Sequence, residues 1–127
     1  MDRDELLIRY AGYLATCNRH DWDALAPFLA ETIVVNGRLR SRTEYADDLR
    51  ALTAVFPDYR WQLQRAVVEG DWLAVHLDDT GTRMAGFLGA PGDGSAVETA
   101  EFAMYHFANS GLITRVEVTA DNSRPTR

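Results

Sequence analysis

The sequence predicts an α+β fold, in which N-terminal helices pack on the concave face of a strongly curved, mainly antiparallel sheet to form a cone-shaped α+β barrel. Apolar residues recur every three or four positions in several segments before residue 57, as in amphipathic helices. From residue 59 onward apolar and polar residues alternate between Gly-containing turns, as in an antiparallel meander. A bent sheet covered by helices leaves space that its own side chains do not easily fill, so this fold class also predicts a small-molecule pocket.

The length and charge of the chain restrict its partners. At 127 residues the chain is long enough to bury a sizeable core, and we expect one domain over residues 1–127 with a frayed tail at 122–127. Acidic residues outnumber basic ones by 19 to 13, and the net charge is −6. Nucleic-acid binding needs a basic surface, so this composition argues against a nucleic-acid partner.

The sequence contains neither a metal-binding pattern nor a membrane segment. Cys17 is the single cysteine, which excludes an intramolecular disulfide and a cysteine-based metal site. The three histidines, His20, His76 and His106, do not have metal-ligand spacing. The N-terminus does not resemble a signal peptide and no apolar segment is long enough to span a membrane, so we expect a cytoplasmic protein without a membrane partner.

The chain begins with two expected helices. The first spans residues 3–18, and its apolar stripe consists of Leu6, Leu7, Tyr10, Tyr13, Leu14 and Cys17. Residues 18–21 break that pattern, and Asp21 is the expected N-cap of a second, short helix. The apolar stripe of the second helix consists of Trp22, Leu25, Phe28 and Leu29.

A short strand and a third helix follow. Thr32–Val35 is rich in β-branched residues and ends at the turn sequence Asn36-Gly37. Ser41 and Glu44 have the spacing of a capping box, which predicts that a helix begins here. Pro57 ends this helix, because the residue before a proline is disfavoured in the helical conformation.

The rest of the chain is predicted as a meander of strands. One face of the first strand carries Tyr59, Trp61, Leu63 and Val67. Gly70-Asp71 makes a tight hairpin turn after it. One face of the second strand carries Leu73, Val75, Leu77 and Asp79. The same alternation leads on to Arg83 if no bulge intervenes.

Glycine-containing segments separate the later strands. We expect bends or bulges of the sheet at Gly81, Gly86 and Gly89. Residues 90–95 form the expected hairpin connection to the longest strand, Val97–Phe107. After a turn at residues 109–111, Leu112–Thr119 is the last expected strand.

Short motifs in a fixed order extend over almost the whole chain. They are Asn18…Asp21, Asn36-Gly37, Phe56-Pro57-Asp58, Glu69-Gly70-Asp71, Gly81-Thr82-Arg83, Gly86-Phe87-Leu88-Gly89, Gly111-Leu112-Ile113 and Asp121. In order and spacing they resemble the SnoaL-like polyketide cyclase family, also called ester-cyclase-like, which has the nuclear-transport-factor-2-like fold. The resemblance implies a pocket for a hydrophobic, often polycyclic, metabolite and acid–base chemistry without a metal or a cofactor. It also implies a homodimer, for which we expect the outer face of the sheet as the interface.

Two positions depart from the family pattern. The family's catalytic Asp, five residues after the Ile of the Gly-x-Ile turn, corresponds to Val118, and the His of the preceding strand corresponds to Ala103. The family's aldol-type ring closure therefore does not transfer residue by residue. One hypothesis is a cofactor-independent cyclase, isomerase or epoxide-opening enzyme whose acid–base groups lie at other positions. The other is a non-catalytic small-molecule binder or dimeric accessory protein with the same pocket.

Glu101 and Tyr105 lead the candidates for catalysis. If Ala103 faces the pocket, the alternation of a strand turns Glu101 and Tyr105 to the same side. Burial raises the pKa of a carboxyl group toward neutrality, so Glu101 is the candidate general acid/base, and Tyr105 is the candidate that orients the substrate. Asp79 and Arg83 complete the candidate catalytic set. The alternatives are a solvated or Arg-paired Glu101 at the pocket rim and a structural ion pair of Arg83 with either acid.

The remaining candidates concern the shape of the pocket. Residues expected to line the core and the pocket are Tyr10, Tyr13, Trp22, Tyr45, Trp61, Phe87, Val116 and Val118. Asn36 follows the first strand near the expected pocket mouth, where it is either a ligand-binding amide or simply a turn residue. His106 is expected on the outer face of the sheet, and a register shift of one residue would turn it into the pocket.

Overall fold

The computed structural model describes residues 1–84 and 92–119. Its helices are α1 (Arg3–Asn18) and α2 (Arg42–Val55), with the 3-10 turns η1 (Trp22–Ala24) and η2 (Ala26–Phe28) between them. Its strands are β1 (Leu29–Val35), β2 (Arg38–Ser41), β3 (Arg60–Glu69), β4 (Trp72–Thr82), β5 (Ala96–Phe107) and β6 (Ile113–Thr119). The predictions for Gly86, Phe87, Gly89, Asp121 and the tail 122–127 lie outside the described residues.

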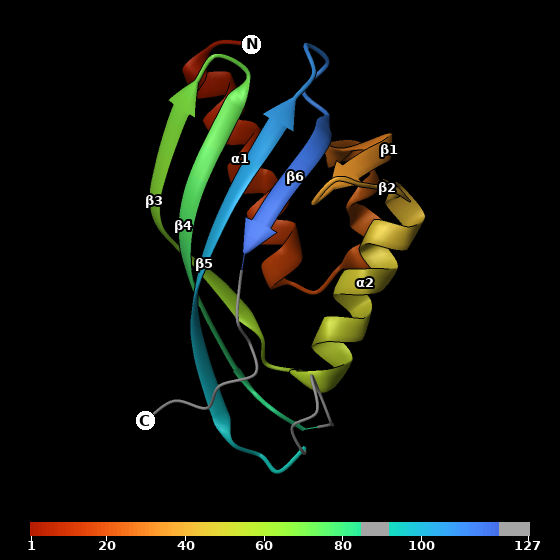
Figure 1. Ribbon diagram of the computed structural model, residues 1–127, viewed down its shortest axis with the longest axis vertical. Helices are drawn as coiled ribbons and strands as arrows, with labels where there is room; N and C mark the ends of the chain where they lie inside the picture. Colours follow the sequence, from red (N-terminus) through yellow and green to blue (C-terminus); the bar gives the residue numbers. More distant parts are fainter. Residues whose placement is uncertain (85–91, 120–127) are drawn as a thin grey trace.

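The strands form a curved six-stranded sheet in the order β2-β1-β6-β5-β4-β3. β1 and β6 are parallel, and the other neighbouring strands are antiparallel. Figure 1 shows the long strands curving past α1 without closing into a ring, with α2 beside β1 and β2. This arrangement confirms the predicted α+β class and the predicted packing of helices on a curved, mainly antiparallel sheet.

Local capping interactions account for where the helices begin and end. The predicted capping box is present at the start of α2, where Ser41 and Glu44 exchange side chain–backbone hydrogen bonds of 2.9 and 3.0 Å. The predicted second short helix is present only as the two 3-10 turns. Asp21 precedes the first of them as predicted, but its side chain makes no capping hydrogen bond, and Leu29 already belongs to β1. Pro27 lacks a backbone N–H, so this short segment cannot continue as an α-helix.

The first strand is longer than its β-branched core, and it pairs with a strand that the pattern did not predict. β1 begins at Leu29 rather than Thr32, and the Asn36-Gly37 turn leads into β2. Both turn residues have positive φ, 49° at Asn36 and 81° at Gly37, as a two-residue hairpin turn with the twist of the strands requires. β2 lacks alternating apolar residues, and none of its four residues is buried.

A bulge in β3 reverses the predicted orientation of its second half. Leu63 and Val67 were predicted to share the inner face with Trp61, but their exposed fractions are 42% and 56%. Leu63 still lies opposite the buried Leu77, so its exposure is not a reversal. The pairing with β4 shifts register between Leu63 and Arg65, so one extra residue turns the side chains after it, Val67 among them, to the opposite face. Ala66 and Val68 therefore pack against the core instead.

β4 keeps its predicted alternation throughout. Leu73, Leu77 and Asp79 are buried, and Gly81 pairs with Val97 of β5 without a shift of register. Gly81 is therefore not a bulge. Its missing side chain leaves room for Tyr59, whose ring carbon would lie 3.1 Å from an added Cβ atom.

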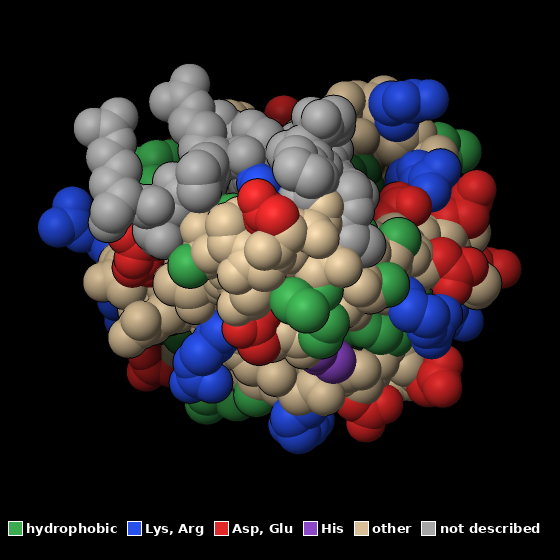
Figure 2. All heavy atoms as spheres, turned by 90° about the horizontal axis from the view of Figure 1, so that it is seen from below, with side chains coloured by type: hydrophobic (Ala, Val, Ile, Leu, Met, Phe, Trp, Pro, Cys, Tyr) green, Lys and Arg blue, Asp and Glu red, His purple; other side chains and the backbone are tan. Residues whose placement is uncertain are grey.

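The surface does not gather charges of one sign at the end of the molecule shown in Figure 2. Basic and acidic side chains are interspersed there, with small apolar areas between them. In the described ranges, no helix has the length and apolar character needed to cross a membrane.

Candidate functional site

The concave face of the sheet and the two helices enclose a cavity of about 230 Å3. The helices contribute mostly apolar wall residues, among them Leu14, Leu49 and Leu52. β5 contributes Glu101 and Tyr105, which lead the predicted catalytic set. The cavity therefore combines an apolar wall with a small number of polar groups, as ligand pockets commonly do.

Strand alternation turns Glu101 into this cavity. On β5 the side chains of Glu101, Ala103 and Tyr105 are buried, whereas those of Phe102 and Met104 are exposed. The exposed fraction of Glu101 is 8%. The alternative of a solvated carboxylate at the rim is therefore wrong for Glu101.

A second buried carboxyl group lies on the neighbouring strand. In the pairing of β4 with β5, Leu77 lies opposite Glu101 and Asp79 lies opposite Thr99, so Asp79 and Glu101 are diagonal neighbours on one face. Asp79 is completely buried, and its Oδ2 accepts a hydrogen bond of 2.9 Å from the hydroxyl of Tyr59. Asp79 itself is not among the described residues that line the cavity.

The environment of Asp79 favours its protonated form. Burial is the largest effect, and the adjacent carboxyl of Glu101 adds to it, so that the pKa of Asp79 rises to about 9, while the Tyr59 hydrogen bond acts in the opposite direction. Two carboxyl groups this close in a low-dielectric site are poorly stable as two anions. The pair can therefore hold a proton at neutral pH while one of its members faces the cavity.

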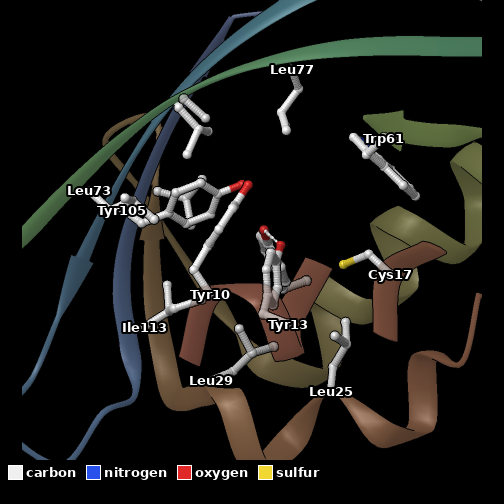
Figure 3. Close-up of a cluster of buried hydrophobic side chains, with 14 of the residues drawn as sticks. Tyr10, Tyr13, Cys17, Leu25, Leu29, Trp61, Leu73, Leu77, Tyr105 and Ile113 are labelled. Atoms are coloured by element: carbon white, nitrogen blue, oxygen red, sulfur yellow. Dashed lines mark hydrogen bonds between the residues drawn. The ribbon is translucent and has the colours of Figure 1, made fainter. Parts of the chain in front are cut away.

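Four tyrosines lie together between α1, α2 and β5. The hydroxyl oxygens of Tyr13 and Tyr45 are 2.6 Å apart and buried. The ring of Tyr105 packs against those of Tyr10 and Tyr13, with centroid distances of 5.0 and 5.7 Å. Figure 3 shows the hydroxyl ends of Tyr10, Tyr13 and Tyr105 pointing toward the middle of the cone, with Cys17 near Tyr13.

The structure brings most of the predicted binding residues to the cavity. Those that line it are Tyr13, Tyr45, Trp61, Val116 and Val118. In the described part of the chain, neither Tyr10 nor Trp22 belongs to this lining. Tyr10 packs behind Tyr105, and Trp22 lies in a separate depression between η1 and α2.

Three other candidates lie away from the cavity. Arg83 is buried beyond the end of β4, where its backbone bonds to Ser95 and Gly94, and it is not among the described lining residues. Asn36 is a turn residue whose Oδ1 accepts a hydrogen bond of 2.8 Å from the backbone N–H of Val118. His106 stays on the outer face, where its Nδ1 lies 2.6 Å from the Thr114 hydroxyl. Phe87 lies outside the described residues.

Tyr59 and Cys17 are site residues that the sequence reasoning did not single out. Tyr59 shares a face of the predicted strand with Trp61, and Trp61 pairs with Asp79 across the sheet. That pairing would have indicated a contact between Tyr59 and Asp79. Cys17 lies one turn after Tyr13 on the same helix stripe and lines the same cavity. Burial raises the pKa of its thiol to about 12, so it is not a nucleophile at neutral pH.

The two positions that depart from the family pattern face each other. Ala103 of β5 and Val118 of β6 are direct cross-strand partners. A His and an Asp at these positions would therefore be neighbours, but here both side chains are apolar. Within residues 1–84 and 92–119, no group of three or more His, Cys, Asp or Glu residues could hold a metal ion.

The end of α1 holds the beginning of β3. The Asn18 amide donates to the Trp61 carbonyl and accepts from the Trp61 N–H, both at 2.8 Å. The Nε2–H of His20 donates to the carbonyl of Tyr59 at 2.7 Å. These contacts fix Trp61 of β3 and Tyr59, the residue before β3. Both line the cavity, and Tyr59 also donates its hydroxyl to Asp79.

Replacing Asn18 with alanine is expected to lower the free energy of unfolding by about 2 kcal/mol, because two backbone groups of Trp61 lose their partners. Urea unfolding monitored by tryptophan fluorescence measures this change. Gln62→Ala is the matched control, since Gln62 is exposed on the same strand, and it should change the stability by no more than about 0.5 kcal/mol. An equal effect of the two substitutions would contradict the role of Asn18.

Known proteins with similar sequences and structures have the same fold as this chain. The family model for SnoaL-like polyketide cyclases matches residues 8–127. A SnoaL-like polyketide cyclase from Agrobacterium tumefaciens strain C58 is similar in structure, with a TM-score of 0.84, 29% sequence identity and coverage of 91% of each chain. A polyketide cyclase from Xanthomonas campestris gives a TM-score of 0.75 at 25% identity, covering 91% of this chain and 90% of the other.

At lower identity the likeness concerns the fold alone. IdmH from Streptomyces antibioticus gives a TM-score of 0.81 at 24% identity, with coverage of 92% of each chain. A search of curated proteins finds no significant match. Because the family model covers almost the whole chain, this protein belongs to the SnoaL-like polyketide cyclase family.

Proposed function

We propose that this protein is a cofactor-independent acid–base enzyme that acts on a hydrophobic, polyketide-like metabolite held in the cavity. One observation carries the proposal: Glu101 faces an apolar cavity, and a second buried carboxyl group, Asp79, lies directly behind it. Similar structures that are named polyketide cyclases support the class of substrate. The acid–base step itself is assigned to Glu101 and Asp79 of this chain and not to the residues that the family pattern uses.

In the proposed reaction Glu101 moves a proton to and from a carbon atom of the substrate. Its carboxylate takes a proton from a carbon next to a carbonyl group, and the C–H electron pair becomes a C=C bond while the C=O electron pair moves to oxygen. Return of the proton at another carbon would isomerise the substrate. Attack of the enolate carbon on a second carbonyl would form a C–C bond and close a ring, and the oxygen of that carbonyl would take the proton back from Glu101 to become a hydroxyl group. Both outcomes need only proton transfer and one group that alternates between acid and base.

Asp79 and Tyr59 support Glu101 in this proposal. Asp79 keeps a proton and reduces the build-up of negative charge when Glu101 is ionised, and Tyr59 fixes the orientation of Asp79. Asp79 is therefore a positioning residue rather than a group that contacts substrate. Tyr105 lines the cavity and orients the substrate. Arg83 has no direct contact with substrate in this proposal, because it lies away from the described lining.

A non-catalytic binder is the second candidate, because Ala103 and Val118 leave the family's catalytic positions apolar. A homodimer is proposed in either case. Phe102 and Met104, which are 57% and 43% exposed, present apolar side chains on the outer face of β5 that a second copy could cover.

Hydrogen–deuterium exchange separates the two candidate functions. The probe is α-tetralone, a small bicyclic ketone with an acidic methylene group next to its carbonyl. In heavy water, the enzyme is expected to accelerate loss of the methylene proton NMR signal at least tenfold over buffer alone. Saturable binding of α-tetralone without any acceleration of exchange would favour the binder and contradict acid–base catalysis.

A further inference from the structure

The hydroxyl pair of Tyr13 and Tyr45 is a polar feature of the cavity that the acid–base proposal does not use. Tyr13 comes from α1 and Tyr45 from the first turn of α2, so two separate helices bring the two oxygens to 2.6 Å. Both residues line the same cavity as Glu101. Both rings are buried, and Tyr13 packs against Tyr105 at 5.7 Å.

A count of protons shows what this pair lacks. Each hydroxyl group carries one proton, and the bond between the two oxygens uses only one of them. One O–H group of the pair is therefore left to donate elsewhere. One protein atom beside the pair is the sulfur of Cys17, which interacts with the Tyr13 hydroxyl. Sulfur is a weak acceptor, so an oxygen placed in the cavity would be a better partner.

The surroundings keep both tyrosines as donors. Burial raises the pKa of Tyr13 and of Tyr45 well above the usual tyrosine value, so neither ionises at physiological pH. Glu101 and Tyr45 line the same cavity, and the charge of Glu101 adds to the rise in the pKa of Tyr45. An O–H donor without a strong acceptor in an apolar cavity favours a ligand that supplies one.

We propose that the Tyr13–Tyr45 hydroxyl pair is the binding site for the carbonyl oxygen of an enolisable ketone. The spare O–H donates to the carbonyl oxygen, and the second hydroxyl supports it through their mutual hydrogen bond. An acceptor of this kind uses the unused donor without introducing a second negative charge beside Glu101. The substrate class is therefore a neutral ketone with an apolar ring system that the cavity walls enclose.

This inference rests on the proposed function for its catalytic consequence. A ketone held by the tyrosine pair has its carbonyl oxygen on the helix side of the cavity, and Glu101 approaches from the sheet side. Proton removal by Glu101 shifts negative charge onto the carbonyl oxygen, where the hydrogen bond strengthens as the charge develops. The pair would thus bind the ketone and also lower the barrier to enolisation.

Infrared spectroscopy of bound α-tetralone tests the oxygen site without a need for turnover. In the wild-type protein the carbonyl stretching band is expected to move to lower frequency on binding. The double variant Tyr13→Phe/Tyr45→Phe should lose this shift and bind α-tetralone about tenfold more weakly, the effect of one lost hydrogen bond. Its affinity for tetralin, the same ring system without oxygen, should be unchanged, which also shows that the cavity is still folded.

Two control variants separate this proposal from the proposed function. Glu101→Gln should keep the shift of the carbonyl band even though it loses exchange activity. Tyr10 is a buried tyrosine behind the cavity wall, so Tyr10→Phe should change neither the band shift nor the exchange rate. The oxygen site is overturned if α-tetralone does not bind the wild-type protein or binds without a band shift. It is equally overturned if the shift survives in the double variant, or if that variant loses tetralin as strongly as α-tetralone.

Discussion

Replacing Glu101 with glutamine is expected to reduce enzyme-catalysed deuterium exchange of α-tetralone by about two to four orders of magnitude, or to the buffer rate if the wild-type acceleration is smaller. Glutamine has nearly the same shape as glutamate but cannot take a proton. Since Glu101 is buried in the cavity wall, solvent does not readily replace it as the base. The rate of signal loss in proton NMR, with wild-type and variant at equal concentration, measures the effect.

Glu98→Gln is the matched control for this substitution. Glu98 lies on the same strand but is exposed on its opposite face, so its replacement removes the same charge without touching the cavity. The control should exchange α-tetralone at the wild-type rate. Wild-type activity in Glu101→Gln would assign the base to another group, and equal loss in both variants would indicate an effect of net charge alone.

The stability of the protein is expected to rise as the pH is lowered from about 8 to about 5. Asp79 has an ordinary pKa of about 3.8 when unfolded and one raised to about 9 in the folded protein. Between these values folding takes up a proton, so the free energy of unfolding falls as the pH rises. One proton gives a slope of up to about 1.4 kcal/mol per pH unit. Thermal unfolding at a series of pH values would show the slope as a steady change in Tm.

The variant Asp79→Asn should flatten this dependence, because the amide does not titrate. Asp78→Asn is the matched control, since Asp78 is the next residue of β4 and lies on its outer face. The carboxyl groups with lowered pKa values, such as Asp58 and Asp93, titrate below the range measured. A Tm that falls toward pH 5, or a slope that survives unchanged in Asp79→Asn, would contradict a proton held on Asp79.

Much of this site was predictable from alternation along the strands. The residues of β4 and β5 keep a strict inward–outward order, so placing Ala103 inward also turned Glu101 and Tyr105 inward. The alternation of β4 likewise buried Asp79 on that face, although Asp79 is not among the described lining residues. Successive side chains of a strand point to opposite faces, so the alternation of apolar and polar residues in the sequence shows which residues are buried. The capping box at Ser41 was predictable for the same reason, because its partners are three residues apart.

The features that were not predictable depend on contacts between distant segments. The bulge after Leu63 has no sequence signal of its own, and it reversed the orientation of half a strand. The hydrogen bond between Tyr59 and Asp79 required the register of β3 on β4. The Tyr13–Tyr45 pair joins residues from two helices, and their spacing in sequence contains no information about the distance between their hydroxyls.

The apolar pair Ala103–Val118 is where we expect this chain to differ from the pattern of its family. Both positions lie where an acid–base pair would fit, and the carboxyl pair of this protein lies on β4 and β5 instead of β5 and β6. If the acid–base proposal holds, the catalytic groups have moved by one strand while the fold and the cavity are retained. Membership of the family would then not fix the position of the acid–base residue, which would have to be determined for each protein from its own structure.

Difference infrared spectroscopy of the ligand-free protein tests the proton held on Asp79 most directly. At neutral pH the wild-type spectrum should contain the carbonyl band of a protonated carboxylic acid in an apolar environment. That band should disappear or shift in Asp79→Asn and stay unchanged in Asp78→Asn. A wild-type spectrum at neutral pH with ionised carboxylates only, and no such band, would contradict the account.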